Sequence, residues 1–319
     1  ACDYVFDARV SYVTEIKVVS SPAATGDNRV EPVCCFDFND DGVVDNKLGD
    51  ILSLTIVRGQ FNVNTTLEEQ ISEGGLVLLL ETKNVTDVAT SSNVTINGFY
   101  GADADADPSN NASGTASFVV NPSSFAPNTM SPVISFTGGA IASSTLNAGP
   151  SIFRLSIPLL GASLDLAING TRFESPVAAG PAGADKGLAM GGEDGGKLGG
   201  YVAMRDFATA FNTYLDAECG CIAKTDESKP FVSVTTGAAA ESLSLNIKNG
   251  AACTGEDEST CKSVADALGT FGAILAGFLT PDIDANGDGV KESLSIGVRL
   301  KATSAMVPNP GGVAECTAE

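Results

Sequence analysis

Apolar and polar residues alternate one by one over much of the first half of the chain, which is the pattern of β-strands. In the segment 10–18, one face carries Val10, Tyr12, Thr14, Ile16 and Val18, and the other carries Ser11, Glu15 and Lys17. Clusters of Gly, Pro, Asn and Ser separate further strand-like runs at 51–57, 76–81, 93–100, 116–120, 133–137, 152–160 and 163–168. We therefore expect a mainly β fold, an antiparallel β-sandwich or a jelly-roll-like barrel.

The second half of the chain is expected to be α+β. Two amphipathic helices are predicted at 204–215 and 264–279, because apolar residues recur there at helical spacing. Strands are predicted at 231–236, 243–248 and 293–301, and a short helix at 66–72, where Thr65 and Thr66 each precede a Glu by three residues. We expect a sandwich domain over 1–180, a glycine-rich loop over 181–200, and an α+β part over 201–319 that packs on the first sheet or completes it.

Two nine-residue segments repeat one acidic phrase, D-x-N-x-D-G-x-x-[D/E], and oxygen ligands at alternate residues before a glycine are what Ca²⁺ requires. The candidate ligands are Asp37, Asn39, Asp41, Asp45 and the carbonyl of Val43 in the first loop, and Asp284, Asn286, Asp288, Glu292 and the carbonyl of Val290 in the second. Asp50 and Asp282 are further candidates just outside the phrases. The alternative is a pair of solvated acidic turns without an ion.

These phrases resemble the Asp-rich calcium loops of dockerins, thrombospondin type-3 repeats and integrin-type propellers, over about nine residues each. An EF-hand would also place Glu at the twelfth position, where Leu48 and Ser295 stand. The whole chain is similar at most to uncharacterised secreted bacterial proteins that end in such a loop followed by L-S-x-G. The resemblance implies a structural ion and no particular reaction. A third acidic run, Asp103, Asp105 and Asp107, lacks the glycine and is expected to be either a weak ion site or a solvated loop.

The charge balance excludes several classes of partner. Lys and Arg number 18 against 39 Asp and Glu, a net charge of −21, so nucleic acid and anionic lipid are not expected to bind. The apolar run 264–279 is shorter than the roughly 20 residues that span a bilayer. No membrane span is therefore predicted.

Eight cysteines in an acidic chain favour an oxidising compartment. They are Cys2, Cys34, Cys35, Cys219, Cys221, Cys253, Cys261 and Cys316. We expect Cys253 to pair with Cys261, Cys2 with Cys34 or Cys35, and Cys316 with Cys219 or Cys221; a Cys₄ zinc site is the alternative. Together with a first residue other than Met, the cysteines predict a processed, secreted or cell-surface protein.

Histidine is absent, which removes Ser-His-Asp and Cys-His catalysis and His-ligated metals. No catalytic motif is recognisable, so we predict a protein that is not an enzyme: a calcium- and disulfide-stabilised structural or adhesive protein, such as a subunit of an extracellular filament. Self-association through sheet edges or the N-terminal strand would build such an assembly. The alternatives are a calcium-dependent module that binds carbohydrate or another ligand, and a secreted hydrolase that uses a carboxylate pair.

Overall fold

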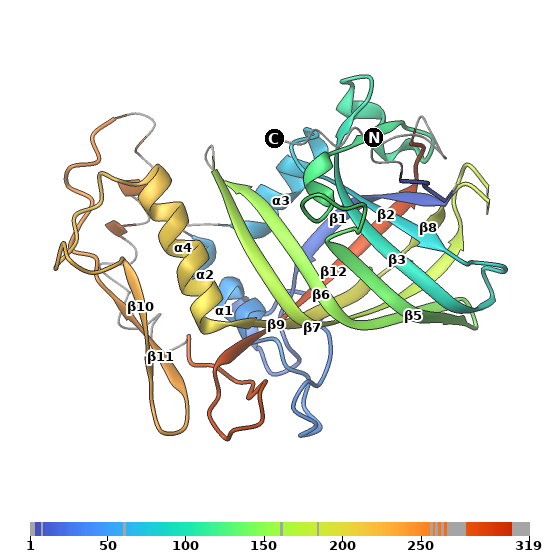
Figure 1. The fold of residues 1–319 in the computed structure, drawn as a ribbon. Coiled ribbons are helices and arrows are strands. Elements are labelled where there is room, and N and C mark those ends of the chain that lie inside the picture. The colour runs from blue at the N-terminus through green and yellow to red at the C-terminus, as the bar shows by residue number, and fades with distance from the viewer. Residues whose placement is uncertain are drawn as a thin grey trace.

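The structure is a computed structural model that describes residues 4–7, 9–59, 62–159, 162–183, 185–255, 258, 261–262, 265–266 and 279–307. Strands dominate it, and most of them belong to one antiparallel sheet (Figure 1). The order around this sheet is β1, β2, β3, β5, β6, β7, β9 and β12, and β12 returns to β1. Their bounds are β1 Val10–Val18, β2 Val77–Lys83, β3 Thr90–Asp103, β5 Ile134–Ala142, β6 Thr145–Leu159, β7 Ala162–Ala179, β9 Gly196–Ala203 and β12 Ser293–Ser304.

The sheet closes because β12 pairs along both of its edges. On one side its register with β1 runs from Ser304 opposite Ser11 to Val298 opposite Val18. On the other side it pairs with β9 from Ser293 to Leu300. The fold is thus a closed eight-stranded antiparallel barrel, and the expected sandwich or jelly-roll is wrong. Alternation and turns look alike in these architectures, and only the long-range pairing of β12 distinguishes them.

Apolar side chains fill the inside of the barrel. Seven of its strands contribute to one cluster, which consists of Leu78, Leu80, Ile96, Phe136, Phe153, Phe173, Leu198 and Leu300. The void left among them is about 10 Å³, roughly the space of a single water-sized sphere. Around these described residues the interior is therefore a packed core rather than a ligand cavity.

The outer wall near the N-terminus carries a second apolar layer. Tyr4 and Phe6 cover Phe99, with ring centroids 5.5 and 5.2 Å from it. Beneath them lies the buried carboxylate of Glu81, which accepts hydrogen bonds from the Tyr4 hydroxyl and the Asn97 amide. A buried charge needs such partners, so the N-terminal segment is fixed to the barrel by polar as well as apolar contacts.

Both edges of the N-terminal strand β1 make pairing contacts within the barrel. β1 is paired with β12 along its length and with β2 at Val10 to Tyr12. Further along, the Asn64 side chain bonds the N–H and C=O of Val18 at 2.8 and 2.9 Å. These contacts occupy most of the backbone groups through which the strand could pair with another molecule, and self-association through it stays a prediction.

The remaining elements near the barrel are short. They are β4 (Phe118–Val120), β8 (Leu188–Met190), α1 (Lys47–Ser53), α2 (Thr55–Arg58), α3 (Val63–Ser72) and the 3₁₀ turns Gly26–Asn28, Pro108–Ser113 and Pro122–Ser124. The predicted strand at 51–57 is thus helical. The predicted loop at 181–200 contains β8 and the first half of β9. The expected helix at 66–72 is present, but Asn62 caps it rather than Thr65 or Thr66.

A smaller lobe lies beside the barrel (Figure 1). It contains α4 (Met204–Glu218) and the hairpin of β10 (Val232–Thr236) and β11 (Glu241–Leu245). Disulfides join Cys219 to Cys261 and Cys221 to Cys253. The predicted Cys253–Cys261 bridge is therefore wrong, and so is the predicted pairing of Cys316 with Cys219 or Cys221. Cys34 pairs with the adjacent Cys35, also against expectation. Cys2, Cys316 and most of the predicted helix 264–279 lie outside the described residues.

The length and apolarity of the helices bear on the predicted absence of a membrane span. Within the part of the chain that the structure describes, none of the helices is long and apolar enough to cross a bilayer.

Packing inside the barrel can be tested with one pair of matched substitutions. Ile134 is fully buried, whereas Ile152 is 46% exposed. We expect Ile134→Ala to lower the free energy of unfolding by about 2–5 kcal/mol, because it leaves a cavity. Ile152→Ala should change it by less than about 0.5 kcal/mol. Urea unfolding followed by circular dichroism measures both, and equal effects would contradict the packed interior.

Tyr12 should make the fold sensitive to alkali. Burial, and then the charge of Asp103, raise the pKa of Tyr12 to about 12, while its hydroxyl donates to the carbonyl of Ile71. The unfolded chain loses this proton near pH 10, so the stabilisation is complete below pH 10 and is lost as pH rises toward 12. Between pH 9 and 11 the free energy of unfolding should fall by about 1 kcal/mol less in Tyr12→Phe than in the parent protein. Identical pH profiles in urea unfolding would contradict this role.

Candidate metal centre

The two acidic phrases fold into loops with the same internal hydrogen bonds. We call residues 37–45 loop 1 and residues 284–292 loop 2. In each loop the first acid accepts from the backbone N–H groups of positions 5 and 6, the Asn at position 3 accepts from position 5, and the Asp at position 5 accepts from position 7. The ninth residue accepts through its side chain from the N–H of position 2. Two segments far apart in sequence have thus reached one geometry.

The backbone of both loops turns at the same positions. Position 4 has a positive φ in each, 57° at Asp40 and 75° at Gly287. Position 6 follows with 85° at Gly42 and 89° at Gly289. A glycine adopts such angles without strain, and no neighbouring atom would obstruct a Cβ at either Gly42 or Gly289. The glycine of the phrase therefore serves the turn and not close packing.

Each loop is closed at its base by one backbone hydrogen bond. The N–H of Asp45 donates to the carbonyl of Phe36 at 2.8 Å, and the N–H of Glu292 donates to the carbonyl of Ile283 at 3.1 Å. In both loops this bond joins the ninth residue to the residue just before the phrase. The side chains at positions 1, 3, 5 and 9 are thereby gathered over a short closed turn.

Loop 2 brings three carboxylates together. Oxygens of Asp284, Asp288 and Glu292 lie within 4.8 Å of one another. One carboxylate oxygen of Glu292 accepts from the N–H of Ala285, while its Oε2 is buried and has no hydrogen-bond partner. A buried, unpartnered carboxylate oxygen is costly unless a cation or donor meets it. These three residues therefore fit a hard divalent cation such as Ca²⁺, which they would bind through oxygen.

Loop 1 has the same frame but a more open set of acids. Among the described residues, oxygens within 4.8 Å of one another are found for the three acids of loop 2 but not for those of loop 1. Burial raises the pKa of Asp45, and the hydrogen bond from the N–H of Phe38 partly opposes this shift. The nearby charges of Asp282, Asp41 and Asp37 raise the pKa further. Negative charge thus accumulates at the base of loop 1, where a cation would offset it.

The two acids outside the phrases have other partners. Both carboxylate oxygens of Asp50 accept from Ser21, through its N–H and its hydroxyl, at 2.7 Å each. Asp282 is bound in the same way by the N–H and hydroxyl of Ser295. Burial raises the pKa of Asp282, and the bonds from Ser295 oppose the shift. Asp50 and Asp282 thus use their carboxylates to bind Ser21 and Ser295 beside the loops.

Ser295 and Asn46 connect the loops to each other. The hydroxyl of Ser295 accepts from the N–H of Lys47, two residues after loop 1, at 2.7 Å. The Asn46 amide both accepts from the N–H and donates to the carbonyl of Gly297, at 2.7 and 3.2 Å. Ser295 and Gly297 belong to β12, which follows loop 2. Both loops therefore lie at the same end of the barrel (Figure 1).

Sequence reasoning did not identify the residues that fix loop 1 in place. Asn46 is 2% exposed and also donates to the carbonyls of Val19 and Cys34. Arg172 donates to the carbonyl of Asp37 and lies over the ring of Phe38. The one signal in the sequence was an Asn directly after the ninth position of loop 1. Nothing in the acidic phrase indicates a contact with Arg172.

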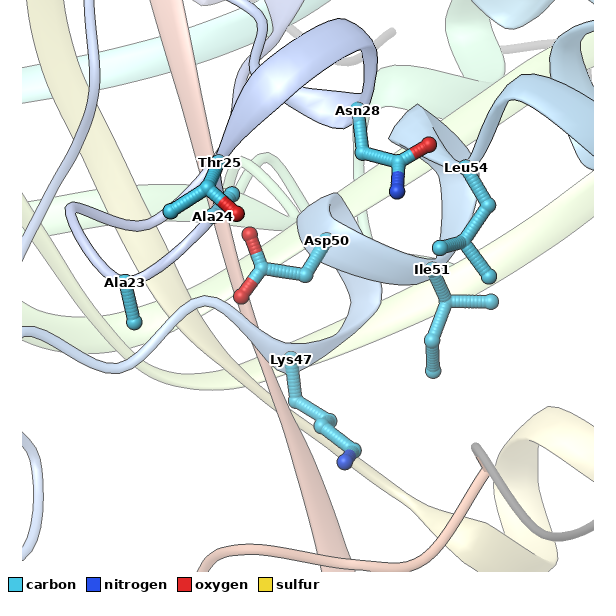
Figure 2. Close-up of a pocket in the computed structure, with 8 residues that line it drawn as sticks. All are labelled: Ala23, Ala24, Thr25, Asn28, Lys47, Asp50, Ile51 and Leu54. Atoms are coloured by element: carbon cyan, nitrogen blue, oxygen red, sulfur yellow. The ribbon is translucent and has the colours of Figure 1, made fainter.

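A shallow depression of about 280 Å³ adjoins α1 (Figure 2). Its wall consists of Ala23, Ala24, Thr25, Asn28, Lys47, Asp50, Ile51 and Leu54. Asp50 is held by Ser21, and Lys47 points away from it in Figure 2. The oxygen of Asn28 is used by Thr55. The charged groups of this depression are thus not directed at one point, as acid–base chemistry would require.

The third acidic run forms a series of turns. Asp103, Asp105 and Asp107 each accept from the N–H two residues further on. Burial raises the pKa of Asp103, the hydrogen bond from the Asp105 N–H opposes this shift, and the Asp105 carboxylate adds to it. The run therefore resembles consecutive Asx-turns more than a loop closed around an ion.

The chain was compared with protein-family models, curated proteins and solved structures. No protein-family model matches the chain, and neither the curated proteins nor the solved structures contain a match.

The loops predict two calcium sites that can be removed separately. By isothermal titration calorimetry we expect the protein to bind two Ca²⁺ with dissociation constants of about 10⁻⁴–10⁻³ M. Asp41→Asn and Asp288→Asn should each remove one site. Asp40→Asn is the matched control, since Asp40 lies within loop 1 but outside its ligand positions, and it should retain both. Unchanged binding in Asp288→Asn would contradict the assignment.

Proposed function

We propose that the protein is a non-catalytic structural or adhesive component of the cell exterior, made rigid by calcium and disulfides. One observation carries this proposal: two loops with the same hydrogen-bond frame meet at one end of a closed barrel and are joined there through Ser295 and Asn46. Paired loops of this kind suit structural ions rather than a reaction centre, because the ions would occupy the carboxylates.

The filled barrel supports a structural role. Many barrels bind small molecules inside, but the void among the eight apolar side chains described inside this barrel is only about 10 Å³. The depression beside α1 lacks a converging acid–base pair, and the chain has no histidine. A carrier or hydrolase is accordingly less well supported than a rigid module.

The cysteines support an exterior location. The bridges Cys219–Cys261 and Cys221–Cys253 close loops of 42 and 32 residues. Cross-links of this span stabilise a fold by roughly 2–4 kcal/mol each and persist in oxidising compartments. The modest affinity expected of the two calcium loops is that of extracellular calcium-binding modules.

Assembly, if it is part of the role, would use side-chain surfaces rather than shared strands. The barrel is closed, and the Asn64 side chain on α3 bonds both backbone groups of Val18 at the end of β1. We therefore propose that contacts with other copies or with a cell surface are made by the exposed face of the folded module.

Differential scanning calorimetry tests the proposed role of calcium. A tenfold excess of Ca²⁺ over the dissociation constant should stabilise the fold by about 1.4 kcal/mol for each site. The melting temperature should rise accordingly and return after addition of EGTA, whereas Asp40→Asn should respond like the parent protein. Negative-stain microscopy of the calcium-loaded protein then examines assembly. A melting temperature that changes with neither calcium nor EGTA would refute the proposal.

A further inference from the structure

We propose that loop 2 is also a clasp, through which calcium binding holds the tip of the β10–β11 hairpin against the barrel. The inference rests on the proposed calcium binding and assigns the two loops different tasks. Calcium in loop 1 would stiffen only the end of the barrel, whereas calcium in loop 2 would also control the attachment of the smaller lobe.

The clasp consists of backbone hydrogen bonds made by Lys291, the eighth residue of loop 2. Its N–H donates to the carbonyl of Ala239 at 3.0 Å, and its carbonyl accepts from the N–H of Glu241 at 2.8 Å. Ala239 and Glu241 lie at the tip of the hairpin, and Lys291 forms a parallel bridge with Ala240 between them. The edge of loop 2 is thus the pairing partner of the tip.

The residues on either side of Lys291 are candidate calcium ligands. Val290 offers its carbonyl and Glu292 its carboxylate. The carbonyl of Glu292 also accepts from the N–H of Met204 at 2.8 Å, at the start of α4. An ion bound by both neighbours would fix the orientation of the Lys291 peptide groups, which are the groups that bind the hairpin. Without the ion, repulsion among Asp284, Asp288 and Glu292 favours opening of the same turn.

The hairpin base is held independently of loop 2. The Asn212 side chain on α4 bonds the N–H and C=O of Val232, at 2.8 Å each. Nearer the tip, Arg205 binds the buried carboxylate of Glu241. Loss of calcium should therefore release the tip from loop 2 while the base remains on α4.

Loop 1 provides a matched comparison because its anchors lie elsewhere. It reaches β12 through Asn46 and Gly297, and β7 through Arg172. It shares the frame of loop 2, so an equivalent substitution removes an equivalent site. Its loss should leave the hairpin contacts of Lys291 intact.

Hydrogen exchange measured by mass spectrometry with residue-level fragmentation tests the clasp in the full-length protein. In saturating calcium the amides of Glu241 and Lys291 should be protected, and EGTA should speed their exchange about tenfold or more, as expected for the loss of the backbone hydrogen bonds. The amides of Val232 and Asn246, at the hairpin base, should change less than about twofold. Asp288→Asn in calcium should reproduce the EGTA result at the tip, and Asp41→Asn should not.

The outcomes separate the clasp from the proposed calcium binding. If calorimetry finds no bound Ca²⁺, the proposed function itself fails. If two ions bind and Asp288→Asn removes one, but Glu241 and Lys291 stay protected, calcium binds and the clasp is refuted. Equal deprotection by Asp41→Asn and Asp288→Asn would also refute it, since the effect would then be general. Should Asp288→Asn fail to fold, the EGTA comparison of tip and base amides in the parent protein decides alone.

Discussion

The pairing of β12 with both β1 and β9 is the constraint on which the rest of the structure depends. This single strand turns a long antiparallel sheet into a barrel, and both acidic loops attach to its first half. Loop 2 leads directly into Ser293, and Asn46, just after loop 1, bonds both backbone groups of Gly297. Barrel closure and the arrangement of the candidate calcium sites therefore arise from the same few residues.

The sequence was informative where a signal was local. Alternation predicted β1 over its whole length, and the apolar stripe at 204–215 predicted α4. The same alternation failed at 51–57, where Asn46 accepts from the N–H of Gly49 and starts α1. Closure of the barrel could not be predicted, because it depends on the pairing of β1 with β12, two strands far apart in the sequence. Neither strand carries a pattern that identifies the other as its partner.

The glycine-rich segment was also predicted wrongly, because its glycines reflect contacts with residues distant in the sequence. The excess of glycine near residue 200 predicted a loop, but three of these residues, Gly196, Gly199 and Gly200, lie in β9, where neighbours approach closely. A Cβ at Gly200 would come within 2.4 Å of the carbonyl oxygen of Asn169, and one at Gly199 within 3.0 Å of the carbonyl oxygen of Ile296. Glycine in a strand can thus reflect close backbone contact rather than a turn, and composition alone does not separate the two.

The repeated phrase shows how far local chemistry extends. Its hydrogen bonds lie within nine residues, so both copies form the same turn whatever surrounds them. The similar segments that follow do not share a structure, because Ile51 lies in a helix and Ser293 starts a strand. Their surroundings also differ in charge: buried Asp45 in loop 1 faces Asp282, whereas loop 2 collects three acids and an unpartnered oxygen of Glu292. Repulsion among these acids opposes closure of the barrel end, and a divalent cation at each loop would offset it. If the proposed sites bind calcium, the ions would hold β12 and the hairpin tip from the same end of the barrel, and a chain with a net charge of −21 would be most rigid where calcium is abundant.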